Sequence, residues 1–266
     1  MEKPGDDDLN ACAAIVEKGD PERFMATMAA PVAARAKLFP LYAFNVEMAR
    51  APWVTQEAMI AEIRLQWWHD ALGEIAQGGS ARRHEVVTPL ATILTPATAR
   101  MLQALVDARQ HDIYPDPFTD MAALEAYLDQ TSGHLMVAAC DVLAKGGVPE
   151  TLSRQVGRAQ GLANLLRALP ALTSLGRSPL PPNLPSGTQS ALQTLAKSRL
   201  NDLRMARARR GEVARPAHPA LLSAWASGPV LKHAVKAPEK ILAGALAPRE
   251  LSSRTRLILR AATGYW

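Results

Sequence analysis

Apolar residues recur every three to four positions along most of this chain, the spacing of helices that bury one face. From Pro21 onward the apolar positions are Phe24, Met25, Met28, Ala29, Val32 and Ala33. The same spacing follows a predicted N-cap at Thr55, where the apolar side is Met59, Ile63, Leu65, Trp67 and Leu72. No segment shows the two-residue alternation of a convincing strand. The pattern predicts an all-α protein.

Further helices are expected over residues 86–93, 95–110, 120–143, 150–169 and 189–210, with three short helices after them. Pro40 is expected to kink or restart its helix, because proline removes a backbone hydrogen bond. Residues 170–187, rich in Pro, Ser and Gly, are expected to form an ordered loop. Since no repeat or shift of composition marks a boundary, we expect a helical domain over residues 20–266 after an acidic segment, residues 1–19, that carries a short helix.

Composition agrees with this interpretation. The 266 residues are 48% hydrophobic but only 5% aromatic, so alanine and leucine, both good helix formers, supply the apolar content. A net charge of +5 permits anionic partners without requiring one. Cys12 and Cys140 show neither disulfide nor zinc spacing, so we expect two reduced thiols and a cytoplasmic protein.

The first residues are acidic and lack the features of a signal or transit peptide. No apolar run reaches the ~18 residues of a membrane-spanning helix. The sequence therefore predicts a protein of the cytoplasm, with peripheral membrane association left open.

Two rows of carboxylates repeat every four residues, a spacing that stacks acids on one helix face. The rows are Glu62, Asp70 and Glu74 (with Gln66 between them), and Asp112, Asp116 and Asp120. The first row could ligate Mg²⁺ or be a solvated face paired with cations. For the second row, Pro115 and Pro117 favour a loop over a helix.

Cations gather in the second half of the chain. Residues 151–201 contain no acid, and residues 197–215 hold seven cations against two acids. The apolar side of this basic helix is Leu192, Leu195, Leu200 and Leu203. Its interpretations are a solvated face, a contact with anionic lipid or a protein, or nucleic-acid binding, for which no stacking aromatics are seen. An anionic partner is one explanation of the acid-free stretch.

Three stretches, LFPLYAFNVEMAR, YLDQTSGHLM and GLANLLRALPALTSLGRSPLPPNLP, lie on separate predicted helices. Together they resemble the squalene/phytoene synthase family, whose enzymes join two prenyl diphosphates head to head. The resemblance covers roughly residues 20–231 and implies a single-domain isoprenoid-synthase-like helical bundle around a central cavity. The stretch EIRLQWWHDALGEI resembles a subfamily that includes an assembly factor for mitochondrial complex I and its bacterial relatives.

The resemblance also implies where a site would lie. In that family two aspartate-rich motifs bind Mg²⁺, which holds and ionises the diphosphates. The matching positions here are Ala49, Arg50 and Trp53 for the first motif, and Ala168 and Leu172 for the second. Arg50 would repel Mg²⁺. The implied ligand-binding residues are Tyr42, Phe44, Asn45, Arg50, Tyr127, Asn164, Arg167 and Arg177. We expect no metal ligands, no confident catalytic residue and no cofactor.

These substitutions favour a family member that does not catalyse. It would act as a binding or assembly factor for a respiratory complex, with a protein partner, or as an isoprenoid or lipid binder. One alternative is an active prenyl transferase that uses Mg²⁺ through displaced acids, Glu47 or the row of Glu62, Asp70 and Glu74. Another is a peripheral binder of anionic membrane through residues 197–215, with nucleic acid less favoured than lipid.

Overall fold

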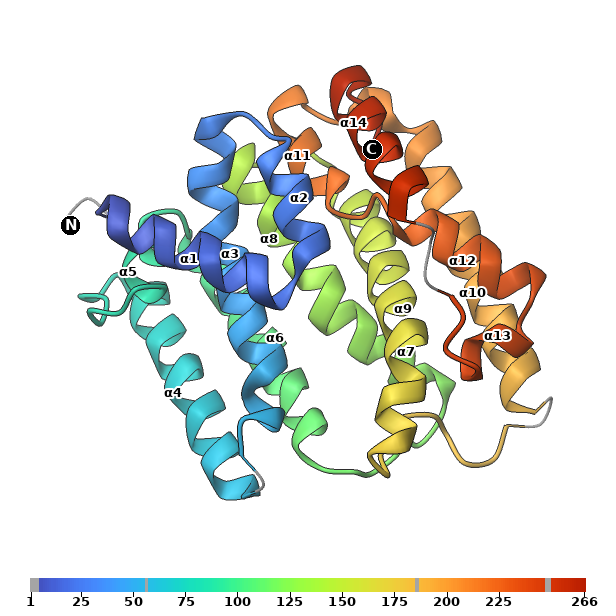
Figure 1. Cartoon of the computed structure of the whole chain (residues 1–266). Coiled ribbons are helices and arrows are strands. Elements are labelled where there is room, and N and C mark those ends of the chain that lie inside the picture. The colour runs from blue at the N-terminus through green and yellow to red at the C-terminus, as the bar shows by residue number, and fades with distance from the viewer. Residues whose placement is uncertain (1–4, 56, 185–186, 247–249) are drawn as a thin grey trace.

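The chain folds as a helical bundle (Figure 1). The computed structural model describes residues 5–55, 57–184, 187–246 and 250–266, without the side chains of 250–254, and no strand occurs among these residues. The α-helices are α1 (Asp6–Gly19), α2 (Pro21–Met28), α3 (Val32–Arg50), α4 (Ala58–Ala76), α5 (Val87–Ala91), α6 (Pro96–Arg109), α7 (Met121–Leu128), α8 (His134–Leu143), α9 (Glu150–Ser174), α10 (Thr188–Ala208), α11 (His218–Leu222), α12 (Ser227–Lys236), α13 (Glu239–Leu242) and α14 (Glu250–Thr263). Short turns are η1 (Ala51–Trp53), η2 (Gln110–Ile113), η3 (Asp129–Gly133, a π-helix), η4 (Arg210–Glu212) and η5 (Arg215–Ala217). The predicted all-α class is confirmed.

The helices α3, α8 and α9 run through the middle of the bundle (Figure 1). The helices α4 and α6 pack together on one side, and α10 and α12 pack together on the other. The first helix, α1, lies against α3 and contributes Cys12 and Val16 to the same core. None of the described helices is both long and apolar enough to cross a bilayer.

Two helices continue through prolines at which the sequence predicted an interruption. The helix α3 runs unbroken past Pro40, and α9 runs past Pro170 to Ser174, so the predicted loop begins later than expected. Each proline costs one backbone hydrogen bond. The side chains on either side of Pro40, from Leu38 to Tyr42, are all buried, and this burial offsets the local loss.

The acid-free stretch is explained by pairing between helices. Four arginines of α9 and α10 meet carboxylates that α2, α7 and η3 supply. The pairs are Arg154 and Arg158 with Asp129, Arg167 with Glu22, and Arg199 with Glu125, at N–O distances of 2.7, 3.8, 2.6 and 3.5 Å. The missing acids therefore lie on neighbouring helices, and these pairs need no anionic partner outside the protein.

Glycines let α9 approach η3 closely. A Cβ atom at Gly157 would lie 2.4 Å from the backbone oxygen of Ser132 and 2.8 Å from Cα of Gly133. A Cβ atom at Gly161 would lie 2.6 Å from Oγ of Ser132. Larger residues would push α9 away from η3. The turn η3 also borders a cavity, and π-helical turns often occur at functional sites.

The two cysteines are free thiols inside the core, as expected. Burial raises the pKa of both Cys12 and Cys140 to about 12 from the usual 9.0. Because the folded protein holds the thiol proton more tightly than the unfolded chain does, each protonated thiol contributes to the free energy of unfolding. This contribution is fully present below the unfolded pKa of 9.0 and is lost as the pH rises toward the folded pKa of about 12.

We therefore expect the free energy of unfolding to fall above pH 9, with each thiol contributing about 1.4 kcal/mol per pH unit between its two pKa values. Urea denaturation at several alkaline pH values measures the slope. In the Cys140→Ala variant the free energy of unfolding should fall less steeply with pH, by about 1.4 kcal/mol per pH unit, which is the contribution of one thiol. Identical slopes for both proteins would contradict the prediction.

Candidate functional site

A cavity of about 340 Å³ opens among α3, α9, η2 and η3. Its floor and walls combine residues far apart in the sequence. The helix α3 contributes Asn45, Ala49 and Arg50, and α9 contributes Gly161, Asn164, Leu165, Ala168 and Leu172. The turn η3 contributes Thr131 and Ser132, the pair that the glycines of α9 hold close. Several positions that the resemblance assigned to a site border this cavity.

Most of the sequence-predicted residues meet there. Those that line the cavity are Asn45, Ala49, Arg50, Trp53, Tyr127, Asn164, Ala168, Leu172 and Arg177. Tyr42 and Phe44 lie in the core instead, 1% and 0% exposed. Arg167 lies beside the cavity and pairs with Glu22. Both sets of motif positions, on α3 and on α9, thus border one space, although they are more than a hundred residues apart.

One cavity wall holds an arginine, an aspartate and a tyrosine in contact. Arg109 Nη1 donates to Asp112 Oδ2 and to the Tyr127 hydroxyl, both at 2.8 Å. The Tyr127 hydroxyl in turn donates to Asp112 Oδ1 at 2.7 Å. Burial raises the pKa of Tyr127, so its phenol stays neutral and donates. The Asp112 carboxylate is therefore engaged by two donors. The sequence reasoning missed Arg109, although its three-residue spacing from Asp112 was a usable signal.

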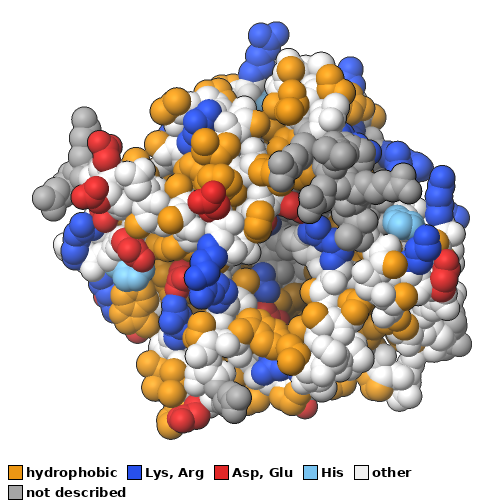
Figure 2. Space-filling view, in the orientation of Figure 1, with side chains coloured by type: hydrophobic (Ala, Val, Ile, Leu, Met, Phe, Trp, Pro, Cys, Tyr) orange, Lys and Arg blue, Asp and Glu red, His pale blue; other side chains and the backbone are white. Residues whose placement is uncertain are grey.

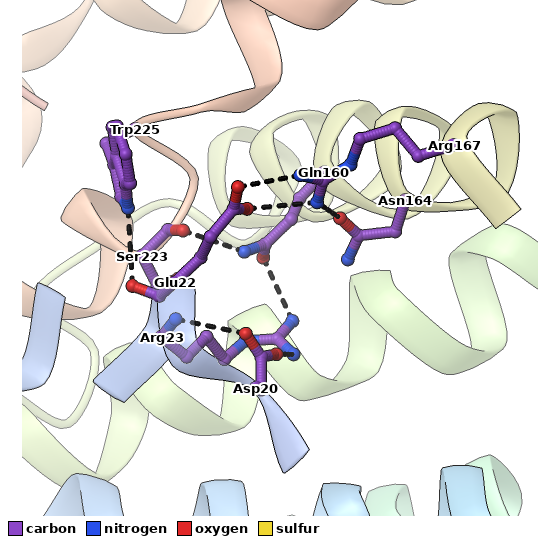
Figure 3. Close-up of polar contacts among 8 residues, drawn as sticks. All are labelled: Asp20, Glu22, Arg23, Gln160, Asn164, Arg167, Ser223 and Trp225. Carbon is purple, nitrogen blue, oxygen red and sulfur yellow. Dashed lines mark hydrogen bonds and ion pairs between the residues drawn. The ribbon is translucent and has the colours of Figure 1, made fainter. Parts of the chain in front are cut away.

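A second carboxylate of the cavity, Asp20, is held in the same way (Figure 3). Arg23 is 4% exposed, and its Nη1 lies 2.7 Å from Asp20 Oδ2. Its Nη2 donates to Gln160 Oε1 at 3.1 Å, and Gln160 Nε2 donates to the backbone oxygen of Ser223 at 2.8 Å. This chain of contacts ties α2 to α9 and to the segment after α11.

The same close-up shows how Arg167 is used (Figure 3). Its two terminal nitrogens donate to the two carboxylate oxygens of Glu22 at 2.6 and 2.9 Å. One of them also donates to Asn164 Oδ1 at 2.9 Å. Trp225 Nε1 donates to the backbone oxygen of Glu22 at 3.3 Å. Arg167 thus forms a bidentate ion pair that joins α9 to α2, and it orients Asn164 at the cavity wall.

Arg177 joins the loop after α9 to the end of η2. It donates to the backbone oxygens of Asp112 and Ile113 at 2.5 and 3.4 Å. A backbone hydrogen bond of 3.1 Å joins Phe118 to Pro179 next to it. The two loops therefore form one rim of the cavity.

Arginines also stand at the cavity mouth. The guanidinium of Arg177 lies over the ring of Trp53, 4.6 Å from its centroid, which is cation–π geometry. Arg50, at the end of α3, is exposed and makes no hydrogen bond or ion pair with any described residue. Its charge is available to an anion that enters the cavity.

The cavity lining does not fit a Mg²⁺–diphosphate cluster. Such a cluster needs several carboxylate oxygens free to coordinate. Of the cavity acids, Asp20 and Asp112 are ion-paired with Arg23 and Arg109 at 2.7 and 2.8 Å. Only Asp116 lines the cavity without such a partner among the described residues. No group of three or more His, Cys, Asp or Glu side chains in that described part could hold a metal ion.

The other carboxylates considered from the sequence have partners of their own. Glu62 accepts from the Tyr114 hydroxyl, Asp70 from Gln66, Glu74 pairs with Arg82, and Glu47 pairs with Arg64. None of these four acids lines the cavity. The row on α4 is a surface face, and Asp112 and Asp116 lie in η2 and the loop after it, as the neighbouring prolines indicated.

Comparison with known proteins adds two kinds of likeness. A sequence model described as squalene/phytoene synthase matches residues 16–260. The chain is 33% identical over 170 residues to the NADH dehydrogenase (ubiquinone) complex I, assembly factor 6 homolog of Drosophila melanogaster, covering 60% of this chain and 50% of that protein. It is 27% identical over 166 residues to human NADH dehydrogenase (ubiquinone) complex I, assembly factor 6, covering 60% and 48%. The chain spans about half the length of these relatives.

Among solved structures, a crystal structure of a dehydrosqualene synthase in complex with ligand is similar to this chain with a TM-score of 0.77. The match covers 96% of this chain and 95% of that one at 15% sequence identity. At this identity the likeness shows the fold, a helical bundle of the isoprenoid-synthase type, which confirms the architecture implied by the resemblance.

Proposed function

The chain belongs to the squalene/phytoene synthase family, and we propose that it acts by binding rather than by condensing prenyl diphosphates. One observation carries the proposal. Ala49, Arg50, Ala168 and Leu172, which the resemblance aligns with the two aspartate-rich motifs, line the cavity, and the nearby carboxylates Asp20 and Asp112 are ion-paired with arginines.

Ionising a prenyl diphosphate places several negative charges on the leaving group, and bridging metal ions are the usual means to neutralise them. A metal ion here would have to displace Arg23 from Asp20 or Arg109 from Asp112, and each displacement leaves a partly buried cation without its partner. Arg50 adds repulsion at the mouth. The cavity therefore favours an anion bound directly by arginine.

The proposed role is assembly of a respiratory complex, through contact with a protein of that complex. Two relatives support it, because the Drosophila melanogaster and human proteins are both named as assembly factors of complex I. Within that role we assign the cavity to an isoprenoid or another anionic lipid. Its lining supports this ligand class, since apolar walls surround the arginines: Val46, Trp53, Phe118, Leu165 and Leu172.

The catalytic alternative is tested by incubating the purified protein with farnesyl or geranylgeranyl diphosphate and Mg²⁺. We expect no head-to-head condensed product in an assay in which an active dehydrosqualene synthase, run in parallel, gives product. Product formation by this chain would overturn the proposal.

The assembly role is tested in cells that make this protein, by deleting its gene and measuring assembled NADH dehydrogenase on native gels. We expect less of the assembled complex, and recovery when the gene is returned. An unchanged amount of complex would exclude the assembly role while leaving the biochemical assay above unaffected.

A further inference from the structure

A second cationic region lies away from the cavity, where α14 meets the end of α10. Arg207 Nε donates to the backbone oxygen of Trp266 at 2.9 Å, and the Arg210 guanidinium lies 5.2 Å from the Tyr265 ring centroid. Arg260 Nη1 donates to the backbone oxygen of Trp225 at 3.2 Å. These contacts hold cations of α10, η4 and α14 close together.

No carboxylate balances these charges among the described side chains. Arg207, Arg210, Arg256 and Arg260 form no salt bridge with a described Asp or Glu side chain, and Arg207 and Arg260 donate to the main-chain oxygens of Trp266 and Trp225. Burial, followed by the charge of the nearby Arg260, lowers the pKa of Arg207 to about 10. Close, partly buried arginines repel one another, so a bound anion would lower the electrostatic repulsion between them.

Apolar side chains are also exposed on α14 and in the residues that follow it. Ile258 and Leu259 are 67% and 60% exposed, and Tyr265 is 42% exposed. A shallow groove on α14 is lined by Arg256, Leu259, Arg260, Thr263 and Tyr265, together with Thr255. Figure 2 shows Lys and Arg side chains beside hydrophobic ones at the top of the molecule, where Figure 1 places α14. The surface is both basic and apolar.

The predicted basic helix, residues 197–215, turns out to be only partly available for such a contact. Its apolar side chains, Leu192, Leu195, Leu200 and Leu203, are buried in the core. Arg199 pairs with Glu125 and Asp202, and Arg209 pairs with Glu212. The helix is therefore not a free amphipathic helix, and its end contributes to a binding face only together with α14.

We propose that this C-terminal cationic face, formed by Arg207, Arg210, Arg256, Leu259, Arg260 and Tyr265, docks on an anionic phospholipid bilayer. Charge complementarity is the reason: lipid phosphates would neutralise the arginines that lack carboxylate partners. Exposed Ile258 and Leu259 favour lipid over nucleic acid, because aliphatic side chains gain by entering the acyl boundary of a membrane. The face lies apart from the cavity, so the proposal does not rest on the cavity's ligand.

Co-sedimentation of the full chain with vesicles tests the proposal. We expect binding to phosphatidylcholine vesicles that contain about 30% phosphatidylglycerol and much weaker binding to pure phosphatidylcholine. Arg256→Glu should weaken binding about 20-fold, since one cation is lost and one repulsive charge is gained at the membrane surface. Leu259→Ser should weaken binding severalfold. Arg100→Glu makes the same charge change at an exposed position on α6 and should change binding less than about twofold.

Circular dichroism of each variant shows whether it is folded. If Arg256→Glu does not fold, the milder Arg256→Gln takes its place. Equal weakening by Arg100→Glu and Arg256→Glu would overturn the proposal, because binding would then follow net charge alone. If millimolar inorganic phosphate released all of the protein from the vesicles, the face would be a site for free phosphate. Tighter binding to a DNA duplex, unaffected by Leu259→Ser, would identify a nucleic-acid surface. Either result would contradict membrane docking.

Discussion

Replacing Arg23 with methionine is expected to lower the free energy of unfolding by about 3 kcal/mol, because removing one partner of a buried ion pair leaves the other uncompensated. Arg23 is 4% exposed and contacts both Asp20 and Gln160. Its guanidinium also lies over the ring of Tyr42, 5.3 Å from the centroid. Methionine fills a similar volume but donates no hydrogen bond. Urea denaturation, followed by circular dichroism, measures the loss.

The matched control is Arg82→Met. Arg82 also forms an arginine–carboxylate pair, with Glu74 at 2.8 Å, but its side chain is 33% exposed and its partner's 39%. Pairs on the surface contribute about 0–1 kcal/mol, so this variant should lose no more than that. Equal losses in the two variants would mean that the buried network of Arg23 adds no more stability than a surface ion pair.

The second large effect is expected at Gly157. Its alanine variant should be less stable by about 2 kcal/mol, because the new Cβ must move backbone atoms of η3 rather than a flexible side chain. The cost from crowding exceeds the gain of about 1 kcal/mol that alanine brings over glycine inside a helix. The same denaturation measurement applies. Since Ser132 lies in both this contact and the cavity lining, ligand binding to the cavity should weaken as well.

Gly211→Ala serves as the control, because a Cβ atom there meets no atom within 4 Å and the residue has no positive φ. We expect a change within about 0.5 kcal/mol for that variant. A Gly157→Ala protein as stable as Gly211→Ala would show that α9 and η3 are not held at the distance the structure gives.

Helix positions were largely predictable from local signals. Asp20, Thr95 and Asp120 cap α2, α6 and α7 by accepting hydrogen bonds from backbone N–H groups, and Asp and Thr are common residue types at N-caps. The predicted helix over residues 189–210 corresponds closely to Thr188–Ala208. Pro40 and Pro170 were misjudged because the cost of a proline is local, whereas the burial that offsets it comes from other helices.

The cavity-lining residues could be predicted only in the stretches that resemble the squalene/phytoene synthase family. The resemblance placed Ala49 and Ala168 at one site, and the structure puts both on the cavity wall. The spacing of Arg109 from Asp112 could have indicated their ion pair, but the contact of Arg109 with Tyr127, eighteen residues away, could not be read from a local pattern. Tyr42 was expected at the ligand but lies beneath the guanidinium of Arg23. The partners of the acid-free stretch were likewise invisible, since Asp129 and Glu22 lie on other elements.

The central claim is that the cavity binds an anionic amphiphile through arginines and without metal. The most direct measurement is calorimetric titration of the full chain with farnesyl thiodiphosphate, a non-reacting diphosphate, once with EDTA and once with millimolar Mg²⁺. We predict binding in EDTA with a Kd that Mg²⁺ changes less than about twofold, and a loss of about tenfold in both conditions for Arg50→Glu. Binding that appears only when Mg²⁺ is present would contradict the claim.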